Sequence, residues 1–221
     1  MTVAAIVPAA GRGERLGAAT PKALVRVAGV TLLEHAVAGL CAAGVDIVMV
    51  AAPEGMLPAV APLVPDATVV AGGATRQDSV RNALAALPAA VDVVLVHDAA
   101  RAFAPPEVTR RVIDAVAAGA EAVVPVLPVT DTVKQVDADE AVVCTIDRSA
   151  LRAVQTPQGF RRTTLDRAHS AGTTATDDAG LVESLGVRVQ TVLGASEAFK
   201  VTTPFDLTVA EAIAARRGAR V

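Results

Sequence analysis

Short apolar runs rich in β-branched residues alternate with segments of helical periodicity along most of this chain. Such runs predict buried strands, and the segments between them predict amphipathic helices. The predicted strands cover residues 3–7, 47–50, 68–71, 93–96, 122–126 and 187–193. The predicted helices cover residues 32–41, 79–87, 106–116 and 177–185, with a last helix from Pro204. The alternation favours an α/β fold with a Rossmann-like, mostly parallel sheet and helices on both of its faces.

The alternation breaks between about residues 127 and 160. Residues 134–143 alternate apolar and polar side chains around an acidic turn at 137–140, which predicts a two-stranded hairpin. Because a lone hairpin is marginally stable, we expect an arm at about 127–149 that packs on another surface. The apolar residues of the arm that need such a surface are Val129, Val133, Val136, Val142 and Ile146. The length of 221 residues otherwise predicts a single domain, residues 1–221, that carries this arm.

Composition excludes several classes of protein. Hydrophobic residues make up 52% of the chain and charged residues 19%, which excludes a disordered protein. Aromatic residues make up only 2%, with no Trp or Tyr, so an aromatic platform for single-stranded nucleic acid is not expected. The net charge of -3 also argues against nucleic-acid binding. No apolar stretch approaches the ~20 residues of a membrane-spanning helix, so we expect no membrane association.

Two further features concern the cellular compartment. Cys41 and Cys144 are isolated and lack the spacing of metal ligands. The N-terminal residues lack the basic region of a secretory signal. Isolated thiols are typical of a reducing compartment, so we expect a cytoplasmic protein.

The first predicted strand runs into a glycine-rich loop, PAAGRGERLG at residues 8–17, followed by Lys22. Glycines after a strand let backbone N–H groups approach a phosphate. The loop lacks the Lys-Ser or Lys-Thr of a P-loop, and Gly17 falls one residue too late for a dinucleotide fingerprint. Two cations, Arg15 and Lys22, instead suit a reaction in which negative charge grows on phosphorus. The alternative is an ordinary strand-to-helix turn with solvated charges.

Two other predicted strands are followed by candidate ligand-binding residues. The segment between one of these strands and the next helix contains Gly72, Gly73 and Ser79. This segment predicts either a nucleotide contact or merely a capped turn. Asp98 follows the most apolar strand and so lies at the edge of the sheet where ligands bind. It suits either Mg²⁺ or substrate hydroxyls. A structural ion pair with Arg101 is the alternative, and His97 is interpreted as a buried histidine.

The loop PAAGxGxR with Pro21 and Lys22 resembles the signature of sugar-nucleotide-type nucleotidyltransferases. The later motifs narrow this resemblance to the 2-C-methyl-D-erythritol 4-phosphate cytidylyltransferases of the non-mevalonate isoprenoid pathway. These motifs are GG at 72–73 with Arg76 and Ser79, VHDAAR at 96–101, DT at 131–132, DR at 147–148, TPQ at 156–158, TDD at 176–178 and KVT at 200–202. The resemblance spans nearly the whole chain.

The resemblance implies transfer of CMP from CTP to 2-C-methyl-D-erythritol 4-phosphate, giving 4-diphosphocytidyl-2-C-methyl-D-erythritol and pyrophosphate, with Mg²⁺ as cofactor. It implies that Arg15 and Lys22 are catalytic, and that the nucleotide is bound by Ala9, Ala10, Gly11, Gly72, Gly73 and Ser79. The residues implied to position the acceptor are Asp98, Arg101, Thr132, Arg148, Thr156 and Lys200. Whether Asp98 meets the metal or the acceptor's hydroxyls stays open. The resemblance further implies a homodimer through the arm, with Arg148 and Thr156 acting in the neighbour's site.

Three alternatives remain. One is a cytidylyltransferase for another polyol phosphate, such as ribitol 5-phosphate. Another is a nucleotide-binding regulator without activity, which the presence of Arg15, Lys22 and Lys200 disfavours. The third is a dinucleotide-dependent oxidoreductase, which the misplaced Gly17 disfavours. The chain also departs from many relatives at Ala74, where an acidic residue is common, and at Arg12.

Overall fold

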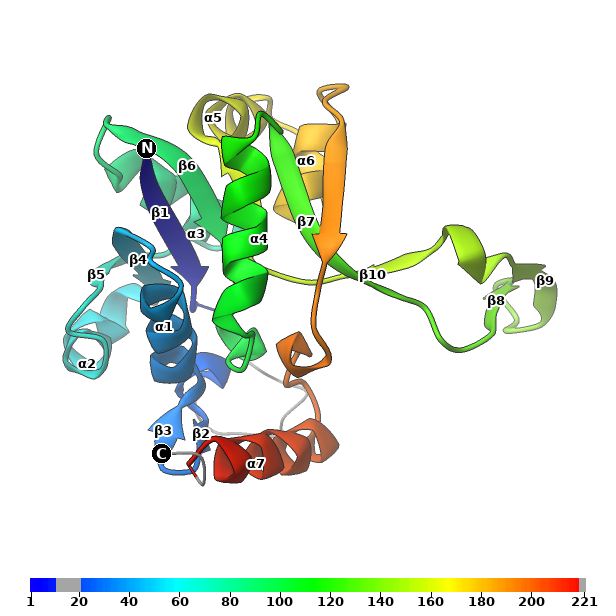
Figure 1. The fold of residues 1–221 in the computed structure, drawn as a ribbon, viewed down its shortest axis with the longest axis horizontal. Helices are drawn as coiled ribbons and strands as arrows, with labels where there is room; N and C mark the ends of the chain where they lie inside the picture. Colours follow the sequence, from blue (N-terminus) through cyan, green and yellow to red (C-terminus); the bar gives the residue numbers. More distant parts are fainter. Residues whose placement is uncertain (11–20, 219–221) are drawn as a thin grey trace.

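An eight-stranded sheet forms the centre of the molecule, whose computed structural model describes residues 1–10 and 21–218 (Figure 1). The strands of the sheet are β1 (Thr2–Pro8), β4 (Ile47–Ala52), β5 (Thr68–Ala71), β6 (Val91–Val96), β7 (Ala122–Pro128), β10 (Arg152–Val154), β11 (Gln158–Arg161) and β12 (Val189–Leu193). They pair in the order β5-β4-β1-β6-β11-β7, and β7 also pairs with β10 and β12.

Most of the strands in this sheet run parallel to their neighbours. The parallel pairs are β1–β4, β1–β6, β4–β5 and β7–β12. The antiparallel pairs are β10–β7, β11–β6 and β11–β7, so every one of them involves β10 or β11. The predicted mostly parallel sheet is therefore confirmed.

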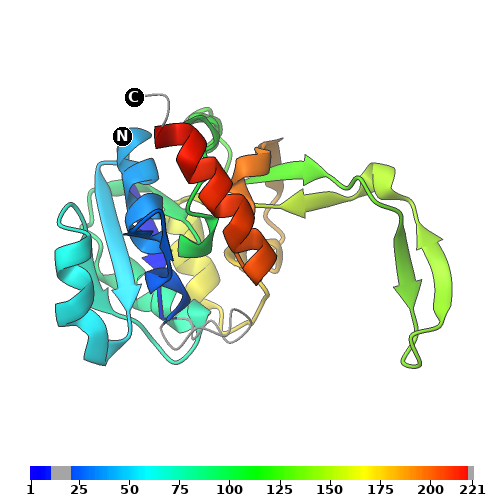
Figure 2. The same ribbon diagram turned by 90° about the horizontal axis from the view of Figure 1, so that it is seen from below.

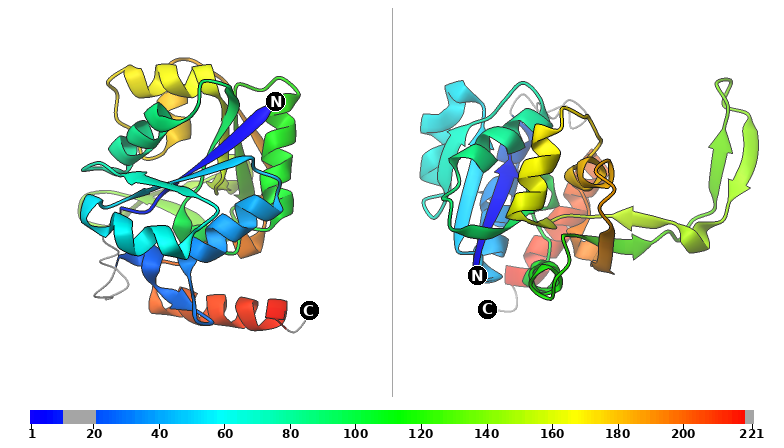
Figure 3. Two further views of the ribbon diagram at one scale, coloured as in Figure 1. Left: turned by 90° about the vertical axis from the view of Figure 1, so that its left-hand side faces the viewer. Right: turned by 90° about the horizontal axis from the view of Figure 1, so that it is seen from above.

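Helices cover both faces of the sheet (Figures 1 and 3). They are α1 (Leu32–Ala42), α2 (Leu57–Val60), α3 (Arg76–Ala86), α4 (Pro106–Ala117), α5 (Arg162–Ser170), α6 (Asp178–Glu183) and α7 (Pro204–Gly218). Alternate residues of β1 pack in opposite directions. Val3, Ala5 and Val7 pack with α1 and α4, whereas Ala4 and Ile6 pack with α3, α5 and α6. Burial on both faces explains why the parallel strands have continuous apolar sequences.

Strands β10 and β11 and helix α5 are the main additions to the predicted elements. The two strands lie in the segment where the sequence predicts only a break in the alternation. They are three and four residues long, and β11 contains Gly159, so their apolar pattern is too short to be read. Helix α5 has a mostly polar sequence, RTTLDRAHS, in which only Leu165 is a large aliphatic residue.

The predicted arm is present as a hairpin of β8 (Val133–Val136) and β9 (Val142–Ile146), which pair with each other. The antiparallel pair β7 and β10 carries the chain outward and back, and the hairpin projects far from the sheet (Figures 1 and 2). Three valines of the hairpin, Val136, Val142 and Val143, are 49%, 62% and 59% exposed. The arm therefore presents apolar side chains that its own chain leaves uncovered.

The last helix, α7, packs against residues from the amino-terminal part of the chain. Helix α7 packs against the small ribbon of β2 (Arg26–Val27) and β3 (Val30–Thr31), with Val27 and Phe103 buried in this contact. The segment between β12 and α7 is thereby held next to the residues around Lys22. Within the described residues, no helix has the length and apolar character needed to cross a membrane.

Candidate active site

Five of the predicted site residues lie where parallel strands end. Ala9 and Ala10 follow β1, the pair Gly72 and Gly73 follows β5, and Asp98 comes two residues after β6. Ligands of open α/β sheets bind at this edge. Gly11 and Arg15 lie outside the described residues.

The loop after β5 is closely braced. The hydroxyl of Ser79 donates to the Thr75 carbonyl at 2.9 Å and accepts from the Gly73 N–H at 3.0 Å. Thr75 and Asp78 form a capping box that starts α3. Ser79 is fully buried, so its hydroxyl supports the loop from within rather than facing solvent.

This loop also touches the segment after β1. A Cβ added to Gly72 would lie 3.1 Å from Ala10 Cβ and 3.0 Å from Ser79 Oγ. The N–H of Gly72 donates to the Ala52 carbonyl at 2.7 Å. A larger residue at position 72 would therefore press on both side chains, and the close approach brings Ala10 and Gly72 together.

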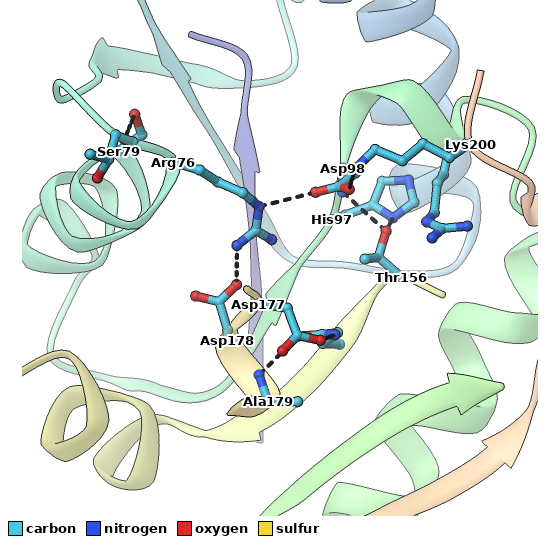
Figure 4. Close-up of polar contacts among 12 residues, drawn as sticks. Arg76, Ser79, His97, Asp98, Thr156, Asp177, Asp178, Ala179 and Lys200 are labelled. Atoms are coloured by element: carbon cyan, nitrogen blue, oxygen red, sulfur yellow. Dashed lines mark hydrogen bonds and ion pairs between the residues drawn. The ribbon is translucent and has the colours of Figure 1, made fainter. Parts of the chain in front are cut away.

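Asp98 is held between two cations from distant parts of the chain (Figure 4). Its Oδ2 accepts from Lys200 Nζ at 2.7 Å, and its Oδ1 accepts from Arg76 Nε at 3.3 Å. Burial by itself would raise the pKa of Asp98, but Arg76 and Lys200 outweigh it and hold that pKa well below its usual range. Asp98 is therefore an anion at neutral pH.

Arg76 makes a second ion pair, with Asp178 at 2.7 Å. Asp178 in turn lies 3.0 Å from His169 Nε2, and both of these side chains are almost completely buried. Arg76, Asp178 and His169 are not among the predicted site residues. The sequence signal for two of them is their position in the GG-x-x-R and TDD motifs.

Thr156 lies beside Asp98 of the same chain. Its Oγ1 accepts from the Asp98 N–H at 3.0 Å and lies 3.0 Å from His97 Nδ1. The sequence predicts that Thr156 acts in a neighbour's site, whereas the structure places its buried hydroxyl on the Asp98 backbone of its own chain. Burial lowers the pKa of His97 to about 4, so the predicted buried histidine is neutral.

The Arg101 side chain is hydrogen-bonded to backbone carbonyls instead of forming the alternative ion pair with Asp98. Its guanidinium donates to the carbonyls of Ala198 and Val154, at 2.8 Å and 3.1 Å. It thus ties the segment after β6 to the segments around β10 and Lys200. Burial lowers the pKa of Arg101 below its usual value, although the nearby Asp98 opposes this.

Lys22 contacts the segment that carries Lys200. Its Nζ donates to Thr202 Oγ1 at 3.3 Å, and Thr202 Oγ1 donates to the Lys200 carbonyl at 3.0 Å. One threonine hydroxyl therefore links the two predicted lysines. Asp206 fixes this segment by accepting from the Thr202 and Thr203 N–H groups, at 2.8 Å and 2.7 Å.

Thr132 and Arg148 lie on the arm and are exposed. The Arg148 guanidinium donates to the Thr130 carbonyl, also on the arm. Because the arm points away from the sheet, the structure does not bring these two residues to Asp98 of their own chain (Figure 1).

The donor groups of the site do not form a metal centre by themselves. Within residues 1–10 and 21–218, no three His, Cys, Asp or Glu side chains are grouped to hold a metal ion. Both oxygens of Asp98 already accept from cationic groups. In this arrangement Asp98 is paired with Arg76 and Lys200, and each of its oxygens keeps a second lone pair.

Comparison with known proteins gives a consistent family. The family model described as 2-C-methyl-D-erythritol 4-phosphate cytidylyltransferase matches residues 3–216. The chain is 58% identical to a protein of that name from Saccharopolyspora erythraea, over 97% of this chain and 100% of the relative. It is 54% identical to a protein of the same name from Rhodococcus jostii, over 96% of this chain and 94% of the relative.

Solved structures agree with these matches. The crystal structure of 2-C-methyl-D-erythritol 4-phosphate cytidylyltransferase from Thermus thermophilus superposes with a TM-score of 0.83. That chain is 42% identical, and the match covers 97% of this chain and 100% of the other. The chain described here belongs to the 2-C-methyl-D-erythritol 4-phosphate cytidylyltransferase family.

Proposed function

We propose that the protein transfers CMP from CTP to 2-C-methyl-D-erythritol 4-phosphate, releasing pyrophosphate, in the synthesis of isoprenoid precursors. The observation that carries this proposal is the family match over residues 3–216, together with the gathering of Gly72, Asp98 and Lys200 at one edge of the sheet. The comparisons do not favour the alternative acceptor, ribitol 5-phosphate.

In the proposed reaction, a phosphate oxygen of the acceptor attacks the α-phosphorus of CTP. A P–O bond forms there, and the bond to the bridging oxygen breaks, so that pyrophosphate leaves with the electron pair. Such a displacement needs positioning and neutralisation of charge more than it needs an acid or base. We assign this neutralisation to Lys22 and Arg15.

Asp98 and Lys200 are proposed to bind the acceptor. Asp98 is ionised, so its oxygens accept hydrogen bonds from hydroxyl groups, and Lys200 supplies a positive charge for the phosphate. The roles of Arg101 and Thr156 follow from their contacts: Arg101 joins the surrounding segments, and Thr156 holds the Asp98 backbone. We propose that both shape the acceptor site.

The loop of Gly72 and Gly73 is proposed to bind cytosine. Both glycine N–H groups are already bonded, to Ala52 and Ser79. Carbonyl oxygens of this loop are therefore the groups that we propose to accept from the cytosine amino group. Ser79 contributes by holding the loop, and Ala9, Ala10 and Gly11 shape the space for the nucleotide.

A divalent cation, Mg²⁺, is proposed to enter with CTP. Mg²⁺ usually keeps several waters and binds through substrate phosphates with one or two carboxylates. The triphosphate oxygens, which enter the site with CTP, are the ligands that we propose. The cation would reduce the negative charge of the triphosphate.

The arm is proposed to form a homodimer. Its exposed valines need a partner surface, and Val154 and Leu193, which lie on β10 and β12 near its base, are also 42% and 64% exposed. A second copy of this chain supplies a matching apolar surface by two-fold symmetry. Arg148 and Thr132 would then complete the acceptor site of the partner.

The exposed thiols of Cys41 and Cys144 suit a reducing cytoplasm.

One experiment tests the activity directly. Pyrophosphate release would be measured with CTP, UTP, ATP and GTP, each against 2-C-methyl-D-erythritol 4-phosphate, ribitol 5-phosphate and other polyol phosphates. We expect release with CTP and 2-C-methyl-D-erythritol 4-phosphate. Faster release with ribitol 5-phosphate would assign a different acceptor, and no release with any pair would indicate a binding protein.

A further inference from the structure

We propose that Arg76 is a positioning residue that ties the nucleotide loop to the acceptor site, and that the buried pair Asp178 and His169 fixes its orientation. This inference rests on the proposed function, because it concerns how CTP and the acceptor are placed relative to each other. It adds three residues to the site, none of which has an assigned role in the reaction above.

Arg76 is the first residue of α3, directly after Thr75 of the capping box. Its guanidinium bonds Asp98 through Nε at 3.3 Å and Asp178 through a terminal nitrogen at 2.7 Å (Figure 4). The donors of a guanidinium lie in one plane at fixed angles, so two bonds to two carboxylates determine where the group lies. Arg76 is therefore a rigid connection from α3 to the end of β6.

The far side of this connection is fixed by a buried pair. Asp178 and His169 are 1% and 2% exposed at their side chains, and they lie on α6 and α5. Burial by itself would raise the pKa of Asp178, but the His169 hydrogen bond and the Arg76 charge outweigh it and lower that pKa. Asp178 thus remains an anion that holds Arg76 from within the core.

The connection joins the two halves of the proposed site. Helix α3 begins in the loop proposed to bind cytosine, and Asp98 is proposed to bind the acceptor. A displacement of about 1 Å between reacting groups can lower a rate by about 10²-fold. The nucleotide loop has its own supports in Thr75 and Ser79, so CTP affinity should not depend on Arg76.

The test is the variant Arg76→Met, with CTP affinity measured by calorimetry without acceptor and with kcat and KM measured for the acceptor. We expect kcat/KM for the acceptor to fall by about 10²-fold. The Kd of CTP should stay within threefold of wild type. Arg81→Met is the matched control, because Arg81 lies on the same helix, its side chain is 52% exposed, and it pairs with Asp78 rather than with Asp98 or Asp178. It should stay within threefold in all three quantities.

Arg76→Gln keeps part of the hydrogen-bonding capacity and decides the question by the same measurements if Arg76→Met does not fold. Acceptor kinetics equal to those of Arg81→Met would overturn the proposal. A parallel loss of CTP affinity would also overturn it, because Arg76 would then only support the nucleotide loop. The wild type in the same assay tests the proposed function separately: without transfer by the wild type, the activity itself is wrong.

Discussion

Lys200 Nζ lies 2.7 Å from Asp98 Oδ2, and the Lys200 side chain is 43% exposed while that of Asp98 is 14% exposed. The lysine is thus an accessible cation resting on a mostly buried carboxylate. On binding of the acceptor, we expect Lys200 to exchange this carboxylate for the acceptor's phosphate. Arg76 also pairs with Asp98, at 3.3 Å, and we expect this ion pair to remain and to keep Asp98 ionised during the exchange.

The first prediction concerns Lys22. Replacement by alanine removes a cation from the region of Thr202 and Lys200, where charge is proposed to develop. We expect Lys22→Ala to lower kcat by about 10²–10³, as for loss of one preorganised electrostatic contact. CTP binding should weaken less. Steady-state kinetics measure both, with Arg110→Ala as the control for loss of a surface cation; a kcat within threefold of wild type would remove Lys22 from the mechanism.

The second prediction concerns the choice of base. Loop carbonyls that accept from the amino group of cytosine would face an oxygen of uracil instead. An unpaired buried polar group costs about 1–3 kcal/mol. We expect kcat/KM for CTP to exceed that for UTP by at least about tenfold. Equal use of CTP and UTP would show that the loop with Ala74 does not read the base.

The third prediction tests the close packing of this loop. A Cβ at Gly73 would lie 2.3 Å from Asp78 Cβ and 3.0 Å from the Asp78 carbonyl carbon, so alanine must distort the start of α3. We expect Gly73→Ala to weaken CTP binding by more than about tenfold, which corresponds to about 1.4 kcal/mol. At Gly55 nothing lies within 4 Å of an added Cβ, so Gly55→Ala is the matched control. Unchanged CTP affinity in Gly73→Ala would separate this loop from the nucleotide site.

The fourth prediction tests the arm. If Arg148 completes the partner's site while Lys22 acts in its own chain, then Lys22→Ala and Arg148→Ala are each inactive alone. In a mixed dimer, one site receives both changes and the other receives neither. Random exchange of subunits makes about half of the dimers mixed, so about a quarter of the wild-type activity should return. Exchange is verified by mass, and verified exchange without activity would show that Arg148 does not act across an interface.

The fifth prediction concerns stability at low pH. Burial lowers the pKa of His97 from 6.5 to about 4, so the unfolded chain binds a proton at a higher pH than the folded one. The stabilisation is complete above pH 6.5 and is lost as the pH falls toward 4. The difference of about 2.5 units corresponds to about 3 kcal/mol of unfolding free energy.

Urea denaturation at about pH 7.5 and about pH 5 measures about 2 kcal/mol of this loss, because pH 5 still lies above the pKa of His97 in the folded protein. The carboxylates Asp98 and Asp178 have lowered pKa values and do not titrate in this window. We expect His97→Gln to have a flatter pH dependence than wild type, whatever its stability at the higher pH. An identical slope in both proteins would attribute the pH dependence to other groups.

The sequence predicts the parallel strands well because both of their faces are buried, which leaves an apolar run that is easy to detect. The bounds of β5, Thr68–Ala71, agree with the prediction, and α1 differs by one residue. Strands β10 and β11 pair antiparallel with β7. The local sequence of these two short strands does not indicate this pairing. Their position depends on pairing between residues far apart in the chain.

The site also contains some residues that the sequence predicts and others that only the fold reveals. Asp98 is predictable because it follows a strand, and a strand end at this edge is a known place for a ligand group. Its partners Arg76 and Lys200 are not predictable from spacing, since they lie 22 and 102 residues away. The roles of Ser79 and Thr156 also depend on the fold, because only the structure shows that their hydroxyls are occupied by backbone groups.

The position of β11 between β6 and β7 has a consequence for biosynthesis. The amino-terminal strands β1, β4, β5 and β6 can pair as soon as they leave the ribosome, but β7 must wait for β11, which follows only after the whole arm has been made. At about 5–20 residues per second, that wait lasts seconds. During it, the edges of β6 and β7 remain open to other chains. Nascent-chain protection by a chaperone would therefore matter most while residues 129–157 are being synthesised.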